Sequence, residues 1–314
     1  MNDILFMVIP CYNEEEVLHE TAKRLREKYD ALISAGSISA ESRIVFVDDG
    51  SKDRTWEIIK ELNTQDGVFR GVKESRNRGH QNALLAGMMT VKDEADMIIS
   101  MDADLQDDIN AIDAMVEKYH GGADIVYGVR NDRKKDSAFK RSSALMFYKL
   151  LKRMGVESVY NHADFRLMSK RAVEALSEFK EVNLFLRGMV PMIGFKTDMV
   201  YYERGERFAG ESKYPLKKMM AFAMEGITSL SVKPIRMITT LGFFIFLVSI
   251  ILAIYFLIRY ITGMTVTGWV TLAMSIWILG GLILMAVGVV GEYVGKIYLE
   301  AKGRPRYIVE EYLK

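Results

Sequence analysis

Two long apolar segments in the C-terminal third constrain the fold more than any other feature of the sequence. Residues 237–258 and 270–290 contain no charged side chain. At about 1.5 Å per residue, each segment is long enough as a helix to cross a hydrocarbon core about 30 Å thick. The connection between them, residues 259–269, carries a single charge, at Arg259. The pattern predicts a transmembrane hairpin over residues 235–295, with the two apolar segments as its spans.

The charges around this hairpin predict its orientation. Cations gather on its outer flanks, at Lys213, Lys217, Lys218, Lys233, Arg236, Lys296, Lys302, Arg304 and Arg306. By the positive-inside rule, both chain ends are expected in the cytoplasm, in a multi-pass protein of the cell inner (plasma) membrane. Residues 215–234 have apolar side chains at helical spacing and predict an interfacial amphipathic helix, and residues 296–314 predict a cytoplasmic tail. Four glycines of the second span allow close packing against the first span or in a homo-oligomer: Gly280, Gly281, Gly288 and Gly291.

The first 214 residues are long enough for one large domain. Half of the 314 residues are hydrophobic, which is sufficient for a core. The 42 basic and 41 acidic side chains leave a net charge of +1, so the composition favours no nucleic-acid partner. A single cysteine, Cys11, excludes an internal disulfide and a cysteine-based zinc site. The N-terminus enters an apolar run without a cationic leader and cleavage site, so we expect no secretory signal.

Three apolar runs in this domain end in polar clusters. Residues 4–9 precede Pro-Cys-Tyr-Asn-Glu-Glu, residues 43–47 precede Asp-Asp-Gly-Ser, and residues 97–101 precede Asp-Ala-Asp-Leu-Gln. Amphipathic segments at helical spacing lie between the runs. The alternation predicts an α/β domain with a Rossmann-like, mostly parallel sheet. Ligands bind beyond the carboxyl ends of such strands, so the three clusters are expected on one rim.

The third cluster predicts a metal site. Side chains at positions i and i+2 of an extended segment point the same way, so Asp102 and Asp104 can grip one hard divalent cation, Mg²⁺ or Mn²⁺. Gln106 can add an oxygen. A cation held there can clamp a nucleotide diphosphate. The alternative is that these are turn or helix-capping aspartates after a strand.

Taken together, the three clusters resemble a known family. The trio V-I-P-x-Y-N-E-E, V-D-D-G-S-x-D-x-T and M-D-A-D-L-Q-D is similar to the family 2 glycosyltransferases, which have the GT-A fold and use nucleotide-sugar donors. With its two C-terminal spans, the whole chain resembles the bacterial polyprenyl-phosphate glycosyltransferases, relatives of dolichol-phosphate mannose synthase. The resemblance implies inverting, metal-dependent transfer of a sugar from a UDP- or GDP-sugar, with UDP-glucose favoured, to undecaprenyl phosphate. The product is a lipid-linked sugar for cell-envelope glycan modification.

The resemblance also implies roles for individual residues. Asp164 lies in an A-D-F-R-L element near the reacting centre, although it can instead cap a nearby helix. Arg207 and Lys213 lie in an R-x-x-G-x-S-K-Y loop suited to a diphosphate, because arginine binds phosphate oxygens bidentately. The catalytic candidates are Asp164, Asp104 and Arg207, and the nucleotide-sugar candidates are Pro10, Tyr12, Glu14, Asp49, Asp102, Arg207 and Lys213. Arg130 and Arg141 are the candidates for the acceptor phosphate.

Two other functions stay open at this point. A processive polysaccharide synthase of the same fold is disfavoured, because such enzymes carry a Gln-x-x-Arg-Trp element and none of the three tryptophans here follows an arginine. A catalytically inactive membrane scaffold or flippase partner is disfavoured because every expected acid is present. His80, at the start of a helix beside a glycine, is interpreted as a structural hydrogen-bond partner.

Overall fold

The computed structural model describes residues 3–130, 162–203, 205, 227–228, 231–263 and 268–314. In this part of the chain an eight-stranded sheet forms the centre of the N-terminal domain. Its strands are β1 (Leu5–Cys11), β2 (Arg43–Asp48), β3 (Phe69–Glu74), β4 (Met97–Ser100), β5 (Ile125–Arg130), β6 (His162–Ser169), β7 (Thr197–Tyr202) and β8 (Val309–Leu313). The helices of the domain are α1 (Leu18–Ser34), α2 (Thr55–Gln65), α3 (His80–Val91), α4 (Ala111–His120), α6 (Lys170–Ser177) and α7 (Leu186–Met192).

The sheet is mostly parallel, as predicted. Its order is β7-β5-β6-β4-β1-β2-β3-β8, in which β6 runs antiparallel to both neighbours and β8 runs antiparallel to β3. The other pairs are parallel. Every residue of β1 is buried, because helices cover both faces of the sheet. The α/β prediction is therefore confirmed.

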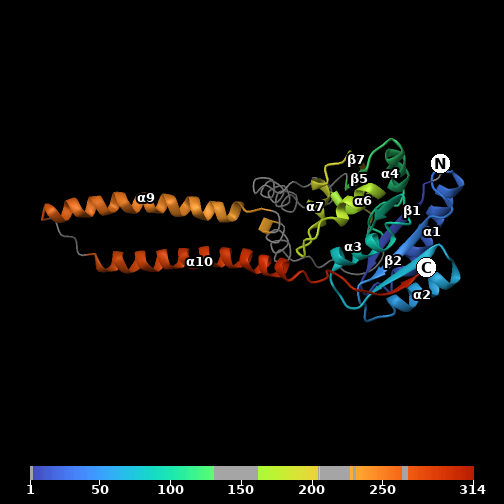
Figure 1. Cartoon of the computed structure of the whole chain (residues 1–314), viewed down its shortest axis with the longest axis horizontal. Helices are drawn as coiled ribbons and strands as arrows, with labels where there is room; N and C mark the ends of the chain where they lie inside the picture. Colours follow the sequence, from blue (N-terminus) through green and yellow to red (C-terminus); the bar gives the residue numbers. More distant parts are fainter. Residues whose placement is uncertain (1–2, 131–161, 204, 206–226, 229–230, 264–267) are drawn as a thin grey trace.

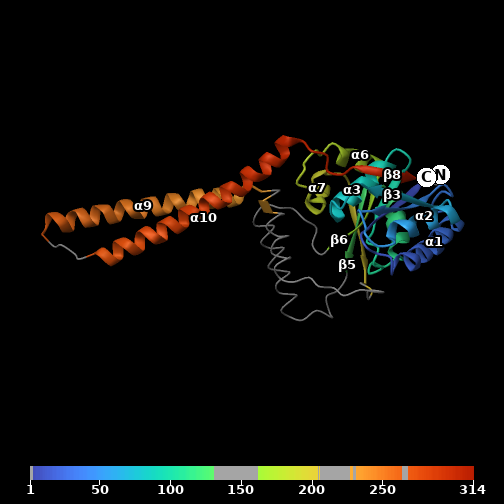
Figure 2. The ribbon, with the colours of Figure 1, turned by 90° about the horizontal axis from the view of Figure 1, so that it is seen from below.

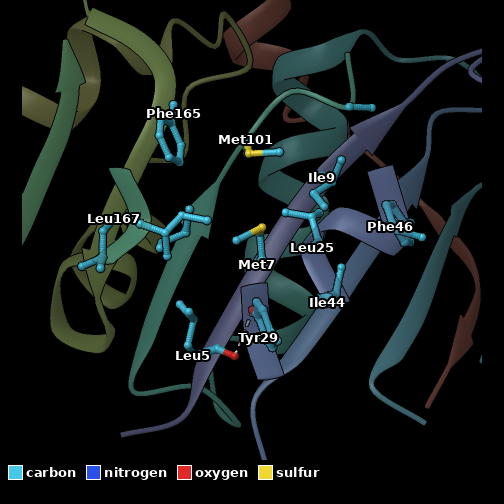
Figure 3. Close-up of a cluster of buried hydrophobic side chains, with 14 of the residues drawn as sticks. Leu5, Met7, Ile9, Leu25, Tyr29, Ile44, Phe46, Met101, Phe165 and Leu167 are labelled. Carbon is cyan, nitrogen blue, oxygen red and sulfur yellow. Dashed lines mark hydrogen bonds between the residues drawn. The ribbon is translucent and has the colours of Figure 1, made fainter. Parts of the chain in front are cut away.

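Two apolar clusters fill the spaces between the sheet and its helices. One lies beneath α1, α2 and α4, and the other beneath α3, α6 and α7. Figure 3 shows part of the first cluster, in which Met7 of β1 and Tyr29 of α1 lie close to each other and Phe46 of β2 lies to their right in the view. The Tyr29 hydroxyl donates to the Arg43 carbonyl at 2.9 Å, which satisfies the buried polar end of the ring.

Two long helices, α9 (Lys233–Ile261) and α10 (Trp269–Lys302), run side by side away from the sheet domain (Figures 1 and 2). Each contains a stretch long and apolar enough to cross a membrane, Lys233–Leu252 and Ile278–Lys302, and neither stretch is buried within the described structure. Their large apolar side chains are exposed. A surface of this kind is stable in lipid rather than in water, so the protein is membrane-associated.

The structure revises the expectations for the segments around the hairpin. Residues 296–314 do more than form a tail, because α10 continues to Lys302 and β8 then joins the sheet beside β3. The interfacial helix expected over residues 215–234 falls largely outside the described residues. At the four glycines of the second span, an added Cβ would meet no atom within 4 Å in the described chain, so none of them marks a tight contact with α9.

Candidate active site

The loops that follow β1, β2 and β4 begin at one rim of the sheet. Cys11 pairs with Asp48 across the first two strands, and Val8 pairs with Ser100 across β1 and β4. The polar clusters predicted to gather at this rim therefore do so. The loops after β1 and β2 are joined directly, because the backbone amide of Asn13 donates to Ser51 Oγ at 3.0 Å and the Asn13 side-chain oxygen accepts from the Lys52 amide at 2.9 Å.

Of the nucleotide candidates in the first loop, Tyr12 is the most accessible. Its side chain is 42% exposed, whereas Pro10 is buried within β1. The backbone amide of Glu14 donates to Thr55 Oγ1 at 2.9 Å, which holds this loop against the start of α2. The arrangement leaves the Tyr12 ring free to contact a planar ligand.

Asp49 is a structural anchor in this structure. It is 2% exposed, and its two oxygens accept the backbone amides of Arg78 at 2.6 Å and Gly79 at 2.9 Å. These bonds fix the turn that leads into α3. The neighbouring Gly50 has φ +65°, and a Cβ there would lie 2.5 Å from the Asn77 amide nitrogen, so this close approach requires glycine. A nucleoside contact by Asp49 stays a prediction, and it would use the remaining lone pairs of the carboxylate.

Glu74 is a buried acid directly behind Asp49, and sequence reasoning did not single it out. Burial, with repulsion from the Asp49 carboxylate, raises the pKa of Glu74 to about 8. Glu74 therefore stays protonated in the folded protein at pH values where the unfolded chain has lost the proton.

This pKa predicts a stability effect. Because the folded state binds the extra proton between about pH 4.5 and pH 8, wild-type stability should fall as pH rises across this window, on the order of 1 kcal/mol per pH unit from this group. Glu74→Gln should remove that slope in thermal unfolding of detergent-solubilised protein. Glu57→Gln, on the exposed face of α2, is the matched control. Parallel pH profiles for wild type and Glu74→Gln would contradict the assignment.

The two candidate metal ligands follow the end of a strand, and Asp104 lies in a turn. β4 ends at Ser100, and the turn contains Leu105 at φ +56°. Both carboxylates thus lie beyond the strand itself, and their joint role at a cation stays a prediction. The Asp104 side chain accepts the Gln106 amide at 3.2 Å, as expected of the turn-aspartate alternative, while Gln106 is 8% exposed.

Asp102 is paired with His80. The two side chains meet at 2.8 Å between His80 Nε2 and Asp102 Oδ1. Burial opposes ionisation of Asp102, but the hydrogen bond and charge of His80 outweigh it, so the pKa of Asp102 is lowered. His80 was expected to be a structural hydrogen-bond partner, and the side chain that it bonds is Asp102, a candidate metal ligand. The two residues are 22 positions apart and belong to different elements, so no local sequence pattern predicts their contact.

The donor set fits a hard divalent cation that is completed by other oxygens. No group of three or more His, Cys, Asp and Glu side chains suited to a metal forms within the described part of the chain. A pair of carboxylates is nevertheless typical of sites where substrate phosphates and water supply the remaining ligands. The side chain of Asp102 is 34% exposed, so its carboxylate is accessible from the rim.

Asp164, on β6, is held by two arginines. Arg187 of α7 donates from Nε to Oδ1 at 3.1 Å and from Nη2 to Oδ2 at 2.9 Å, and buried Arg166 donates to Oδ1 at 3.0 Å. Burial opposes ionisation, but the two guanidinium groups outweigh it and hold the pKa of Asp164 well below its usual range. The helix-cap alternative is wrong, because Ser169 caps α6.

Arg130 forms an ion pair with the buried acid Asp107. Its Nη2 donates to Asp107 Oδ1 at 2.9 Å, and Tyr202 of β7 donates its hydroxyl to the same oxygen. Asp107 is buried, so this cation is fixed at the end of β5. Arg141, Arg207 and Lys213 lie outside the described residues.

Comparison with known proteins assigns the family. Residues 6–177 match the model of glycosyl transferase family 2. An uncharacterized glycosyltransferase of Bacillus subtilis (strain 168), YkoT, is 53% identical over 307 residues, which cover 98% of this chain and 91% of the relative. The SfII prophage-derived bactoprenol glucosyl transferase of Shigella flexneri is 39% identical over 307 residues, covering 97% of each.

The chain belongs to glycosyl transferase family 2, and the predicted family is therefore confirmed. It is a glycosyltransferase with a mostly parallel sheet. Among solved structures, the mannosyltransferase PcManGT from Pyrobaculum calidifontis in complex with GDP-Man and Mn²⁺ is 14% identical, covers 84% of both chains and has a TM-score of 0.46.

Proposed function

We propose that the protein transfers a sugar from a UDP- or GDP-sugar, with UDP-glucose favoured, to a polyprenyl phosphate such as undecaprenyl phosphate. One observation carries this proposal: the acid-lined rim belongs to a sheet domain that is continuous with two exposed apolar helices. A sugar-transfer site fixed to a membrane favours a lipid acceptor over a soluble one. The bactoprenol glucosyl transferases among the relatives support the same acceptor class.

The reaction we propose is a single displacement with inversion. An oxygen of the acceptor phosphate attacks the anomeric carbon, and the bond from that carbon to the donor diphosphate breaks, releasing the nucleoside diphosphate. The acceptor is already an anion at neutral pH, so it requires orientation and loss of hydration more than deprotonation. Asp164, which is ionised between two arginines, suits orientation rather than proton transfer.

The proposed residue roles follow this chemistry. Asp102 and Asp104, with Gln106, would hold Mg²⁺ or Mn²⁺, which offsets the charge that develops on the leaving diphosphate. Arg207 and Lys213 would contact the same diphosphate. The nucleoside would lie against Pro10, Tyr12, Glu14 and Asp49, and the acceptor phosphate against Arg130 and Arg141. To bind the acceptor phosphate, Arg130 would either contact it while still paired with Asp107 or exchange Asp107 for the phosphate.

A donor screen tests the proposal. Membranes containing the protein are incubated with radiolabelled UDP-glucose, UDP-galactose, UDP-N-acetylglucosamine or GDP-mannose. We expect label from one donor, UDP-glucose first, in a chloroform-soluble product that mild acid hydrolyses. Label in a large polymer would favour the processive synthase. The absence of lipid-linked label with every donor would favour the inactive scaffold.

The proposed site also requires a defined membrane topology. A reporter inserted within residues 262–268 should lie outside the cytoplasm, and one fused after Lys314 should lie inside, because cations flank the outer ends of the hairpin. Alkaline phosphatase and green fluorescent protein fusions measure the two locations. A cytoplasmic signal from the loop insertion would rule out a hairpin that crosses the membrane.

A further inference from the structure

The far end of α10 is attached to the sheet domain through one carboxylate. Glu300 Oε2 accepts the Val182 backbone amide at 2.8 Å, while Oε1 accepts the backbone amide of Asn183 at 2.8 Å and its side-chain amide at 2.7 Å. At about 1.5 Å per residue, α10 is about 51 Å long, well beyond a hydrocarbon core of about 30 Å. Glu300 lies beyond the apolar span predicted over residues 270–290, and its bonds to residues 182 and 183 place it on the part of the helix that reaches the sheet domain.

The segment that Glu300 holds leads directly into the active site. Three residues beyond Asn183, the Leu186 amide begins α7 and donates to Gln81 Oε1 at 2.8 Å, beside the His80 that contacts Asp102. The next residue, Arg187, forms the bidentate pair with Asp164. The segment from Val182 to Arg187 is thus bound by Glu300 at one end and pairs with Asp164 at the other.

A second contact fixes the same loop to the chain beyond α10. Arg306 Nη1 donates to the Phe179 carbonyl at 2.9 Å. The helix α10 and its C-terminal extension therefore bind both ends of residues 179–183. One residue of a helix corresponds to a rotation of about 100°, so turning α10 by that amount would withdraw Glu300 from both amides.

Resting on the proposed function, we propose that Glu300 is a positioning residue for sugar transfer, which couples the seating of α10 to the placement of Arg187 and Asp164. Loss of its carboxylate frees the loop and lets Arg187 move. In the proposed arrangement the donor nucleotide is held by other loops of the rim, so its binding is spared. Orientation errors of about 1 Å at a reacting centre can cost up to a hundredfold in rate.

The test compares Glu300→Ala and Glu300→Gln with Glu310→Gln, a control at an exposed residue of β8 that removes a surface ion pair with Lys73. We expect Glu300→Ala to lower kcat about tenfold with the donor KM changed less than about twofold. Glu300→Gln keeps one acceptor oxygen and should fall between Glu300→Ala and wild type. Glu310→Gln should match wild type.

Hydrogen exchange of the full-length protein supplies a readout independent of turnover. Amides in residues 180–192 should exchange faster in Glu300→Ala, while those of β2 should not change. Unchanged exchange in residues 180–192 would show that Glu300 does not hold this segment. Faster exchange with an unaltered kcat would contradict the positioning role of Glu300. A kcat loss that only tracks a loss of folded protein would do the same. If wild type transfers no sugar from any donor, the proposed function fails, and exchange alone decides whether Glu300 places α7.

Discussion

Replacing Asp102 by asparagine is expected to lower kcat on the order of a thousandfold while leaving the protein folded. Asparagine keeps the shape of the side chain and its capacity to bond His80, but it removes the charge that would bind the proposed hard cation. Without that cation, the charge building up on the departing diphosphate is poorly offset, which accounts for several kcal/mol of the barrier. Asp104→Asn should act in the same direction, with a loss that need not be equal because its carboxylate also caps the turn at Gln106.

The measurement separates metal binding from other effects. Turnover is followed at limiting and saturating Mg²⁺ or Mn²⁺, and Mn²⁺ binding is monitored by electron paramagnetic resonance. Asp113→Asn, an exposed acid on α4, provides the matched control and should retain wild-type turnover. Wild-type turnover by Asp102→Asn at limiting cation would remove that residue from the metal site, and the same result for Asp104→Asn would remove the second.

The second large effect is expected at the Asp164 cluster. Asp164→Asn should lower kcat about a hundredfold, because it releases Arg187 from a bidentate pair and leaves buried Arg166 without its anion. Arg187→Lys keeps the charge but loses the fork geometry, so a smaller loss of about tenfold is expected. Arg171→Lys, at the Asp124 ion pair on the surface of α6, is the control.

The pH profile distinguishes orientation from base catalysis. The folded pKa of Asp164 is depressed, so its stabilising contribution is complete above the unfolded value of about 4 and is lost only as pH falls through the lower folded value. The profile of kcat/KM should consequently show no limb from Asp164 between pH 5 and pH 9. A limb in that range that disappears in Asp164→Asn would identify Asp164 as a base.

The parts of the fold that were predictable are those with a continuous apolar signal. β1, β2 and β4 are apolar runs buried on both faces, and the two long helices contain uncharged spans. β6 has no such signal, because its Asp164 and Arg166 satisfy each other within the protein. β8 was missed because it pairs with β3 across a separation in sequence of more than 230 residues, a contact that no local pattern specifies.

The site was predictable in its residue types more than in its contacts. Motif resemblance singled out Asp102, Asp104 and Asp164 as acids of the site. The partners that set their chemistry come from other elements: His80 from α3 and Arg187 from α7. Such pairings depend on how helices pack on the sheet, and the sequence of one loop does not predict which side chain of another element will contact it.

The position of β8 has a consequence for biogenesis. β3 lies between β2 and β8, and β8 is translated only after both apolar helices. Until the ribosome has produced β8, β3 is an open sheet edge that can pair with another chain. The sheet domain therefore acquires its final strand only after both apolar helices have been translated, so emergence of those helices and completion of the sheet are successive steps of one folding pathway.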